Sequence, residues 1–328
     1  MTNAAGKTAL VIGATGGIGG EVARSLLAHG WHVRALHRRP EQAAATAGLP
    51  AAVAWVAGDA MDGEAVLAAA TGADVIVHAA NPPGYRNWKG LALPMLDHSI
   101  AAAEAAGARL VLPGTVYNFG PDAWPRLGED SPQHPRTRKG AIRVEMERRI
   151  EAAAGRGRMR ALIVRAGDFF GPRATANSWF AQIVKPGRPL AAVTYPGRRD
   201  AGHAWAYLPD LAETMVRLVE REAELPAFAR FHFRGHWFEH GVDLADAVRR
   251  VGGRPAAPIR RFPWVAVYAG APFVTLFREL LEMRYLWKEP LALDNARLVA
   301  FLGEEPHTPL DKALRATMAG LGAMPAAA

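Results

Sequence analysis

Short apolar runs alternate with segments of helical character through the first half of the chain. Each run has the length of one strand, and helical stretches between the runs end at turn-favouring residues such as Gly72 and Gly107. Strands separated by helices pair in parallel through right-handed crossovers, so the pattern predicts an α/β fold with a doubly wound parallel sheet. The predicted strands are 8–12, 32–36, 53–57, 74–79, 109–112 and 160–164, and the predicted helices include 62–71 and 95–106.

The alternation loosens after residue 170, where Pro and Gly recur. We therefore expect residues 1–170 to form the sheet domain and residues 171–328 mainly a smaller C-terminal lobe, with 204–222 packing back on the sheet. The most apolar later stretch, 264–277, holds 14 residues and contains Pro272. Since a membrane span needs about 20 apolar residues, it is predicted to be a buried helix. Residues 269–287 are predicted to form one long apolar helix that covers a pocket or an oligomer contact.

A glycine turn follows the first predicted strand, with the spacing Gly13-x-x-Gly16-x-x-Gly19. Gly13 permits the tight turn, Gly16 allows backbone N–H groups to approach a pyrophosphate, and Gly19 allows the following helix to lie close to the strand. The helix N-terminus then presents its positive dipole end to the phosphates. We expect dinucleotide contacts from Gly13, Thr15, Gly16, Gly17, Ile18 and Gly19.

The end of the second strand favours NADP over NAD. It carries His37-Arg38-Arg39 and no acidic residue that could accept hydrogen bonds from the ribose hydroxyls. An arginine fork matches the geometry of a 2′-phosphate, so NADP(H) is the first expectation and NAD(H) the second. Asp59 and Ala60 follow the third strand, where Asp59 either accepts from the adenine amino group or caps the next turn. His78, Ala79 and Ala80 end the fourth strand with side chains small enough to admit the dinucleotide.

The composition of the chain argues against several kinds of site and partner. Half of the 328 residues are hydrophobic, and the absence of cysteine excludes disulfides, thiolate metal sites and a cysteine nucleophile. The net charge is +8, but the arginines are spread along the chain among 31 acidic residues, so we expect no nucleic-acid partner. The first residues lack the apolar core of a signal peptide, and no stretch is long enough to span a bilayer. We expect a cytoplasmic protein without a membrane partner.

The chain resembles the short-chain dehydrogenase/reductase superfamily, in its extended or atypical branch of nucleotide-sugar epimerases and dehydratases. The likeness covers most of the sequence. It rests on the glycine turn, Gly58-Asp59, Val77–Ala80, Val116-Tyr117, Glu145-x-Glu147, Arg165–Pro172 and Ala206-Tyr207-x-x-Asp210. It implies a Rossmann-type sheet and a nicotinamide cofactor. The Arg165–Pro172 segment follows the sixth strand and passes near the nicotinamide in the family, which adds Ala166 and Asp168 to the expected cofactor contacts.

The chemistry of that superfamily needs a serine or threonine, a tyrosine, and a lysine four residues after the tyrosine. Here Lys139 stands at the tyrosine position and Arg143 at the lysine position, while Pro113 occupies the usual serine position with Thr115 two residues later. Three alternatives follow. Lys139 exchanges the proton, with a pKa depressed by Arg143; or Thr115 and Tyr117 act instead; or the site binds NADP without turnover, with Lys139 and Arg143 anchoring ribose or phosphate.

Polar and aromatic residues in the segments that the superfamily uses for substrate suggest an aromatic-walled pocket for a polar or anionic carbonyl compound. The expected substrate contacts are Arg86, Trp88, Trp179 and His203. The function expected is therefore an NADP(H)-dependent oxidoreductase or epimerase/dehydratase-like enzyme on a small carbonyl or sugar-like substrate. The alternative is an NADP-binding regulatory or redox-sensor protein. A homodimer through the helices near Met95 and Lys139 is also expected.

One zinc-protease pattern occurs, His236-x-x-Glu239-His240, but that chemistry requires a helix. Phe231 and Phe233 alternate as in a strand and Gly235 interrupts, so we expect no metal site here.

Overall fold

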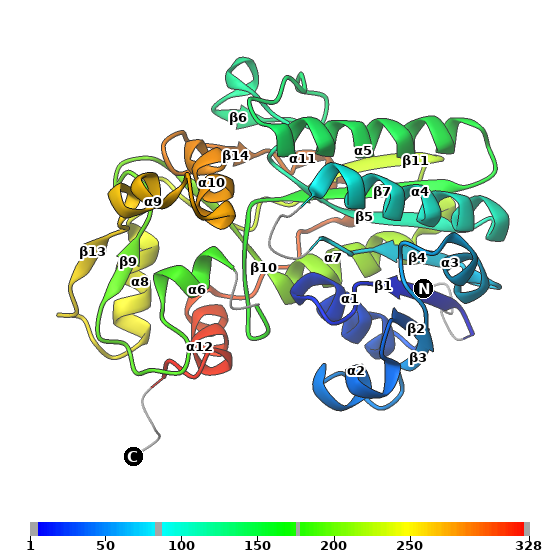
Figure 1. The fold of residues 1–328 in the computed structure, drawn as a ribbon, viewed down its shortest axis with the longest axis horizontal. Helices are drawn as coiled ribbons and strands as arrows, with labels where there is room; N and C mark the ends of the chain where they lie inside the picture. Colours follow the sequence, from blue (N-terminus) through cyan, green and yellow to red (C-terminus); the bar gives the residue numbers. More distant parts are fainter. Residues whose placement is uncertain (1–5, 83–86, 175–177, 325–328) are drawn as a thin grey trace.

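A computed structural model describes residues 6–82, 87–174 and 178–324 of the chain. Its main sheet contains seven parallel strands in the order β11-β7-β5-β4-β1-β2-β3 (Figure 1). The strands are β1 (Thr8–Ile12), β2 (His32–His37), β3 (Ala54–Ala57), β4 (Val75–His78), β5 (Arg109–Thr115), β7 (Arg160–Ala166) and β11 (Phe228–His232). The predicted doubly wound α/β fold is thereby confirmed, and the sequence order reverses at β1, which lies between β4 and β2.

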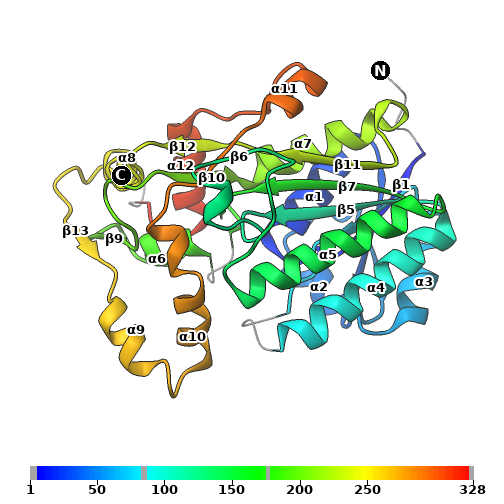
Figure 2. The same ribbon diagram turned by 90° about the horizontal axis from the view of Figure 1, so that it is seen from above.

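Side chains of each central strand alternate between two apolar cores. In β1, Ala9 and Val11 belong to one core, while Leu10 and Ile12 belong to the other. Helices α1 (Gly17–Ala28) and α7 (Leu208–Glu220) cover the first core. Helices α3 (Gly63–Ala70), α4 (Trp88–Ala106) and α5 (Arg138–Gly155) cover the second (Figure 2). Burial on both faces explains why these strands read as continuous apolar runs.

The smaller lobe is built from short strands and helices of the second half of the chain. Strand β10 (His203–Tyr207) lies between β8 (Asp168–Phe170) and β12 (His236–Phe238), and β13 (Ile259–Arg261) pairs with β9 (Val193–Tyr195). Helices α6 (Trp179–Ile183), α8 (Asp243–Val251) and α12 (Leu310–Gly320) pack with these strands around a separate core. Segments α7 and β11 return to the main sheet, and the division at residue 170 stays a prediction.

Two expectations for the apolar stretch were wrong. Residues 269–287 do not form one helix: α9 (Trp264–Gly270) ends before Pro272, and α10 (Thr275–Glu282) and the 3₁₀ turn η4 (Arg284–Trp287) follow. Proline lacks the N–H that would continue the helix, so the chain turns there. Residues 264–277 are also not buried, since Val265 and Phe273 are 84% and 88% exposed. No helix within the described ranges has both the length and the apolarity for a membrane span.

Helix α4 also departs from its predicted bounds. It begins at Trp88 instead of residue 95, and Pro94 lies inside it. Pro94 is the seventh residue of the helix and lacks the N–H that would donate to the carbonyl of Gly90, yet the helix continues beyond it to Ala106. The longer helix brings Trp88, an expected substrate contact, into a buried position at its first turn.

Candidate functional site

The turn between β1 and α1 has no room for side chains at two of its glycines. Gly13 has φ +95°, and a Cβ atom there would lie 2.6 Å from the carbonyl carbon of Ala79. A Cβ atom on Gly19 would lie 2.3 Å from the carbonyl oxygen of Gly13. Gly16 forms the N-cap of α1 in extended conformation, and no side chain caps the helix there. The uncapped helix therefore begins against the carboxyl ends of β1 and β4, where open α/β sheets bind ligands.

The end of β2 presents basic side chains to solvent at the same edge of the sheet. Arg38 and Arg39 are exposed, and the guanidinium of Arg39 donates to Gln42 Oε1 at 3.1 Å. His37 is held locally, because its Nδ1 lies 3.0 Å from the Arg39 backbone nitrogen. No acidic residue occupies positions 37–40. The observed arrangement is compatible with the binding of an additional phosphate at this edge.

Asp59 caps its own turn, since its Oδ1 accepts from the Met61 N–H at 2.9 Å. The cap of helix α3 is a different residue, Asp62, whose carboxylate accepts from Glu64 and Ala65. The turn-capping role is therefore observed, and the adenine contact stays a prediction for the second oxygen of Asp59, which has no hydrogen-bond partner among the described residues.

The end of β4 combines small residues with a buried histidine. Ala79 and Ala80 are half-buried, and His78 is almost fully buried with its Nδ1 2.8 Å from Ser99 Oγ. Burial, reinforced by the positive charge of Arg143, lowers the pKa of His78 to about 3. His78 is therefore neutral at working pH and serves as a hydrogen-bonding residue beneath the site, while the two alanines keep the strand end open.

Lys139 is held by two carboxylates of the smaller lobe. Thr137 caps α5, and its Oγ1 accepts from the Gly140 N–H at 3.0 Å. The Lys139 ammonium, 3% exposed, contacts the carboxylate of Glu279 and lies 2.9 Å from Glu282 Oε2. The Lys139 backbone N–H also donates to Glu282 at 3.0 Å. These contacts, which we call the α5–α10 clamp, join the start of α5 to α10.

The contacts of the clamp lower the pKa of Glu282. Burial acts to raise the pKa of this carboxyl group, but the hydrogen bonds and charge of Lys139 outweigh it, so the pKa lies below its usual range. The carboxylate is thus ionised when it binds the ammonium. The expectation that Arg143 is the charge that governs Lys139 did not include these two acidic neighbours, because they lie about 140 positions away in the sequence.

The other expected catalytic residues surround the start of α5. Thr115 ends β5, and its Oγ1 accepts from the Tyr117 N–H at 3.3 Å. A Cβ atom on Gly140 would lie 2.3 Å from the Tyr117 carbonyl oxygen, so the helix packs directly on this loop. Arg143 lies one turn along α5, with its guanidinium carbon 5.1 Å from the ring centre of Trp88. The structure therefore brings Thr115, Tyr117 and the start of α5 together.

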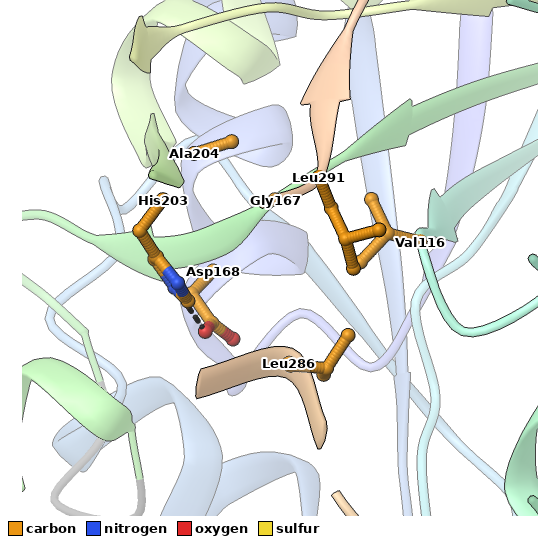
Figure 3. Close-up of a pocket in the computed structure, with 7 residues that line it drawn as sticks. All are labelled: Val116, Gly167, Asp168, His203, Ala204, Leu286 and Leu291. Carbon is orange, nitrogen blue, oxygen red and sulfur yellow. Dashed lines mark hydrogen bonds and ion pairs between the residues drawn. The ribbon is translucent and has the colours of Figure 1, made fainter. Parts of the chain in front are cut away.

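An imidazole–carboxylate pair lies where β7 runs into β8. His203 Nε2 is 2.8 Å from Asp168 Oδ2, and both side chains are nearly buried (Figure 3). The ring of His203 stacks on Trp287 with 4.2 Å between centroids. The pair borders a cavity of about 20 Å³, enough for one water molecule. Its lining residues are Val116, Gly167, Asp168, His203, Ala204, Leu286 and Leu291.

Sequence reasoning assigned Asp168 to the cofactor and His203 to the substrate, and it missed the pair. The two residues are 35 positions apart and meet because β8 and β10 pair in parallel, with Asp168 opposite Trp205. Neither strand was predicted. The signal that the sequence offers is chemical: an aspartate and a histidine each stand beside aromatic residues, in 168–170 and 203–205.

The other residues expected to contact substrate do not lie together: Trp179 and Trp88 belong to different parts of the structure. Trp179 is half-buried at the start of α6, with its ring 5.0 Å from that of Trp287 in an aromatic cluster of the smaller lobe. Trp88 is buried beneath Arg143. Arg86 lies outside the described residues. The cluster forms the wall behind His203, so aromatic groups do border the site.

A buried ionic network that sequence reasoning missed supports the floor of the site. Arg165, at the end of β7, is fully buried and pairs with Glu147 of α5 at 2.5 Å. Glu147 also accepts from Asn118 at 2.9 Å, and Arg165 Nη1 lies 3.2 Å from His232 Nε2. Burial, aided by the Arg165 charge, lowers the pKa of His232 to about 3. This histidine is therefore a neutral member of the network beneath the strand ends.

The zinc-protease pattern has no helix to carry it. The alternation at Phe231 belongs to strand β11, which ends at His232; His236 begins a separate strand, β12, and α8 begins at Asp243, after His240. Within the described part of the chain, no group of three or more metal-ligating side chains is found.

Solved structures of sugar-nucleotide enzymes share the fold over nearly the whole chain. UDP-glucuronic acid 4-epimerase from Bacillus cereus, with UDP-glucuronic acid and NAD, has a TM-score of 0.75 at 16% identity and covers 96% of this chain and 98% of its own. DesIV, a dTDP-glucose 4,6-dehydratase from Streptomyces venezuelae with NAD, has 0.75 at 18% identity over 95% and 96%. MoeE5 with UDP-glucose and NAD has 0.73 at 18% identity over 96% and 98%.

No curated protein sequence matches the chain. At these low identities the structural likeness establishes the fold alone. The family is established by the sequence itself, because a family model matches residues 9–231, from the first strand through β11. That span contains the glycine turn, the start of α5 and the Asp168–His203 pair. The resemblance inferred from the motifs is thereby confirmed: the chain belongs to the NAD dependent epimerase/dehydratase family.

Proposed function

We propose that the chain is an NADP(H)-dependent enzyme of the epimerase/dehydratase type that acts on a small carbonyl or sugar-like substrate. The observation that carries this proposal is the glycine turn, because Gly13 and Gly19 admit no side chain where α1 meets the carboxyl ends of the strands. Such a turn with an uncapped helix N-terminus fits a pyrophosphate. The bound dinucleotide would supply reversible hydride transfer to a carbon of the substrate.

The cofactor preference rests on the end of β2. Arg38 and Arg39 offer planar guanidinium groups, and no acidic residue at positions 37–40 competes for them. The three related structures contain NAD, so the ratio of NADPH to NADH affinity is the decisive measurement. Besides His37–Arg39, the proposed cofactor contacts remain Gly13, Thr15–Gly19, Asp59, Ala60, His78–Ala80, Ala166 and Asp168.

For proton exchange we assign the Asp168–His203 pair. A carboxylate 2.8 Å from one imidazole nitrogen fixes the tautomer and orientation of the ring, so the other nitrogen can exchange a proton with a substrate hydroxyl. Thr115 and Tyr117 are the second candidates, at the end of the neighbouring strand. Lys139 then acts as a positioning residue, since its ammonium is engaged by Glu279 and Glu282 of α10.

The test combines a substrate panel with matched histidine variants. Purified protein is incubated with UDP-glucose, UDP-glucuronic acid, dTDP-glucose and small aldehydes in the presence of each nicotinamide cofactor, and products are followed by NMR and absorbance. His203→Gln should lower kcat by at least about a hundredfold, the usual contribution of a general acid–base group, while cofactor affinity stays the same. His134→Gln, which breaks an exposed His–Asp contact with Asp122, is the control. Equal kcat in both variants would contradict the assignment.

A second candidate function is cofactor binding without turnover. Two observations favour it: the α5–α10 clamp engages Lys139, and the cavity beside His203 has room for about one water molecule. A substrate would need the lobe containing Trp287 to move outward. Tight NADPH binding together with no product from any member of the panel would support this candidate over the enzyme.

A further inference from the structure

Exposed apolar side chains gather on one helical hairpin of the smaller lobe. Eight large hydrophobic residues are exposed in the described part of the chain, and five of them lie between positions 265 and 276. These five are Val265, Tyr268, Phe273, Val274 and Leu276. The other three are Met61 in the turn before α3, Leu67 in α3 and Val299 in α11; exposed hydrophobic residues outside clusters are common. A cluster of this kind marks an interaction surface.

The hairpin consists of two helices that pack on each other and project from the rest of the protein. Helices α9 and α10 are joined by residues 271–274, and Figure 2 shows the pair extending away from the two main layers. The two helices pack on each other, since a Cβ atom on Gly270 would lie 2.6 Å from the Phe277 ring. On the inner side Val267 is buried and Glu279 holds Lys139. The apolar cluster therefore faces outward while the inner face is occupied.

The surroundings of this cluster are basic. Residues 254–278 contain four arginines and no aspartate or glutamate, in a chain of net charge +8. Arg260 and Arg261 are exposed on β13, next to the hairpin, and within the described ranges they form no ion pair. Arg284 lies 5.1 Å from the ring centres of both Trp264 and Tyr268 and donates to the Tyr268 hydroxyl at 2.6 Å. Aromatic groups and arginines thus share one surface.

We propose that the α9–α10 hairpin binds the surface of anionic lipid bilayers. Val265, Phe273 and Leu276 would enter the boundary between headgroups and acyl chains, while Arg260 and Arg261 would face anionic headgroups. Apolar and aromatic residues beside arginines are the features of segments that lie in a membrane interface without spanning it. A second copy of the chain is a poorer occupant, because it would bring the same unpaired arginines against each other. The hairpin is too short to span a bilayer.

This proposal revises the expectation of no membrane partner, which rested on the lack of a spanning segment. It does not depend on the proposed enzyme activity, because none of the residues it uses touches the Asp168–His203 pair or the glycine turn. The two proposals can therefore fail separately.

Vesicle flotation tests the proposal directly. The full-length protein should float with vesicles of phosphatidylcholine containing one-third phosphatidylglycerol, and not with pure phosphatidylcholine, and binding should weaken as salt is raised. Val265→Asp/Phe273→Asp should lower the partition coefficient by more than about tenfold. Met61→Asp/Leu67→Asp, which changes two exposed apolar residues elsewhere, is the matched control and should bind as the wild type does.

A second pair of variants tests the charges. Arg260→Gln/Arg261→Gln should weaken binding to the anionic vesicles by about tenfold or more, since each basic residue near an anionic surface contributes to affinity. Arg188→Gln/Arg315→Gln removes the same charge from exposed positions outside the hairpin and should leave binding unchanged. Equal losses in both pairs would show that only net charge matters and would overturn the assignment to the hairpin.

The absence of cysteine gives a readout that does not depend on a disruptive variant. Phe273→Cys, labelled with an environment-sensitive dye, should shift to shorter emission wavelength on anionic vesicles, whereas labelled Met61→Cys should not. No shift at residue 273, or no flotation of the wild type, would overturn the proposal. If Val265→Asp/Phe273→Asp instead separates a dimer in sedimentation velocity and the wild type ignores vesicles, the surface is a contact between copies.

Discussion

Replacing Lys139 by methionine tests the α5–α10 clamp, because it removes the ammonium and retains the length of the side chain. Lys139 is 3% exposed, and the two carboxylates that it binds are nearly buried. Removing one partner of a buried ion pair leaves the other charge uncompensated and costs about 3–5 kcal/mol. Here Arg138 lies 3.8 Å from Glu279 and 3.5 Å from Glu282 and supplies partial compensation. We therefore expect a loss of about 3 kcal/mol in the free energy of unfolding.

Urea denaturation followed by tryptophan fluorescence measures this loss. Arg138→Met is the control: its side chain is 80% exposed, so its ion pairs should contribute less than about 1 kcal/mol. The triple variant Lys139→Met/Glu279→Gln/Glu282→Gln should recover most of the stability, because it leaves no buried charge without a partner. A Lys139→Met cost below about 1 kcal/mol, or a triple variant no more stable than the single one, would refute the clamp.

Three further predictions address the cofactor site and the pH dependence of stability. Arg38→Glu should weaken NADPH binding much more than NADH binding in a fluorescence titration, and equal losses would contradict the phosphate assignment. Gly19→Ala should abolish binding of both cofactors, since its Cβ atom would lie 2.3 Å from a carbonyl oxygen of the turn; normal affinity would show that the turn is not the binding site. Burial opposes the charge of His29, but the carboxylates of Glu213 and Glu220, each 3.0 Å away, raise its pKa above 6.5. The stabilisation is thus fully present below pH 6.5 and is lost as pH rises through the raised pKa. His29→Gln should cost less than about 1 kcal/mol at pH 6, and the cost should vanish at higher pH; a cost independent of pH would contradict this assignment.

The sequence was most informative where local pattern and tertiary environment agree. Strand β1 is buried on both faces, so its apolar run is continuous, and the glycines that follow have no room for a side chain, Gly19 against the turn itself and Gly13 against Ala79 at the end of β4. By contrast, the strand predicted over 109–112 extends to Thr115 as β5, although Pro113 and Gly114 are poor strand residues. The strand continues because β7 pairs with it through Thr115, and Gly114 leaves space for the side chain of Arg165. Neighbouring strands thus override local propensity.

The sequence predicted site residues that belong to a motif, but not the contacts between residues that are distant in the sequence. Lys139 and Arg143 were found because they occupy positions that a motif defines, but no local pattern shows that Lys139 meets Glu279 and Glu282. The same holds for Asp168 and His203, which meet through two strands too short to give a periodic signal. Contacts between residues so far apart in the sequence depend on how the whole smaller lobe folds. The catalytic roles of these residues stay predictions.

Helix α10 shows why apolarity alone predicted the wrong environment. Its one exposed large hydrophobic residue is Leu276, while Glu279 and Glu282 bind Lys139 and Phe277 packs against Gly270 of α9. In a helix that packs on a core, the apolar face would point inward. Here a buried ammonium holds the two glutamates inward, and Leu276 stays exposed together with the four exposed apolar residues of α9 and the connecting loop. The apolarity of the hairpin therefore does not place it in the core, and its exposed apolar residues, beside Arg260 and Arg261, form the surface assigned to an anionic bilayer.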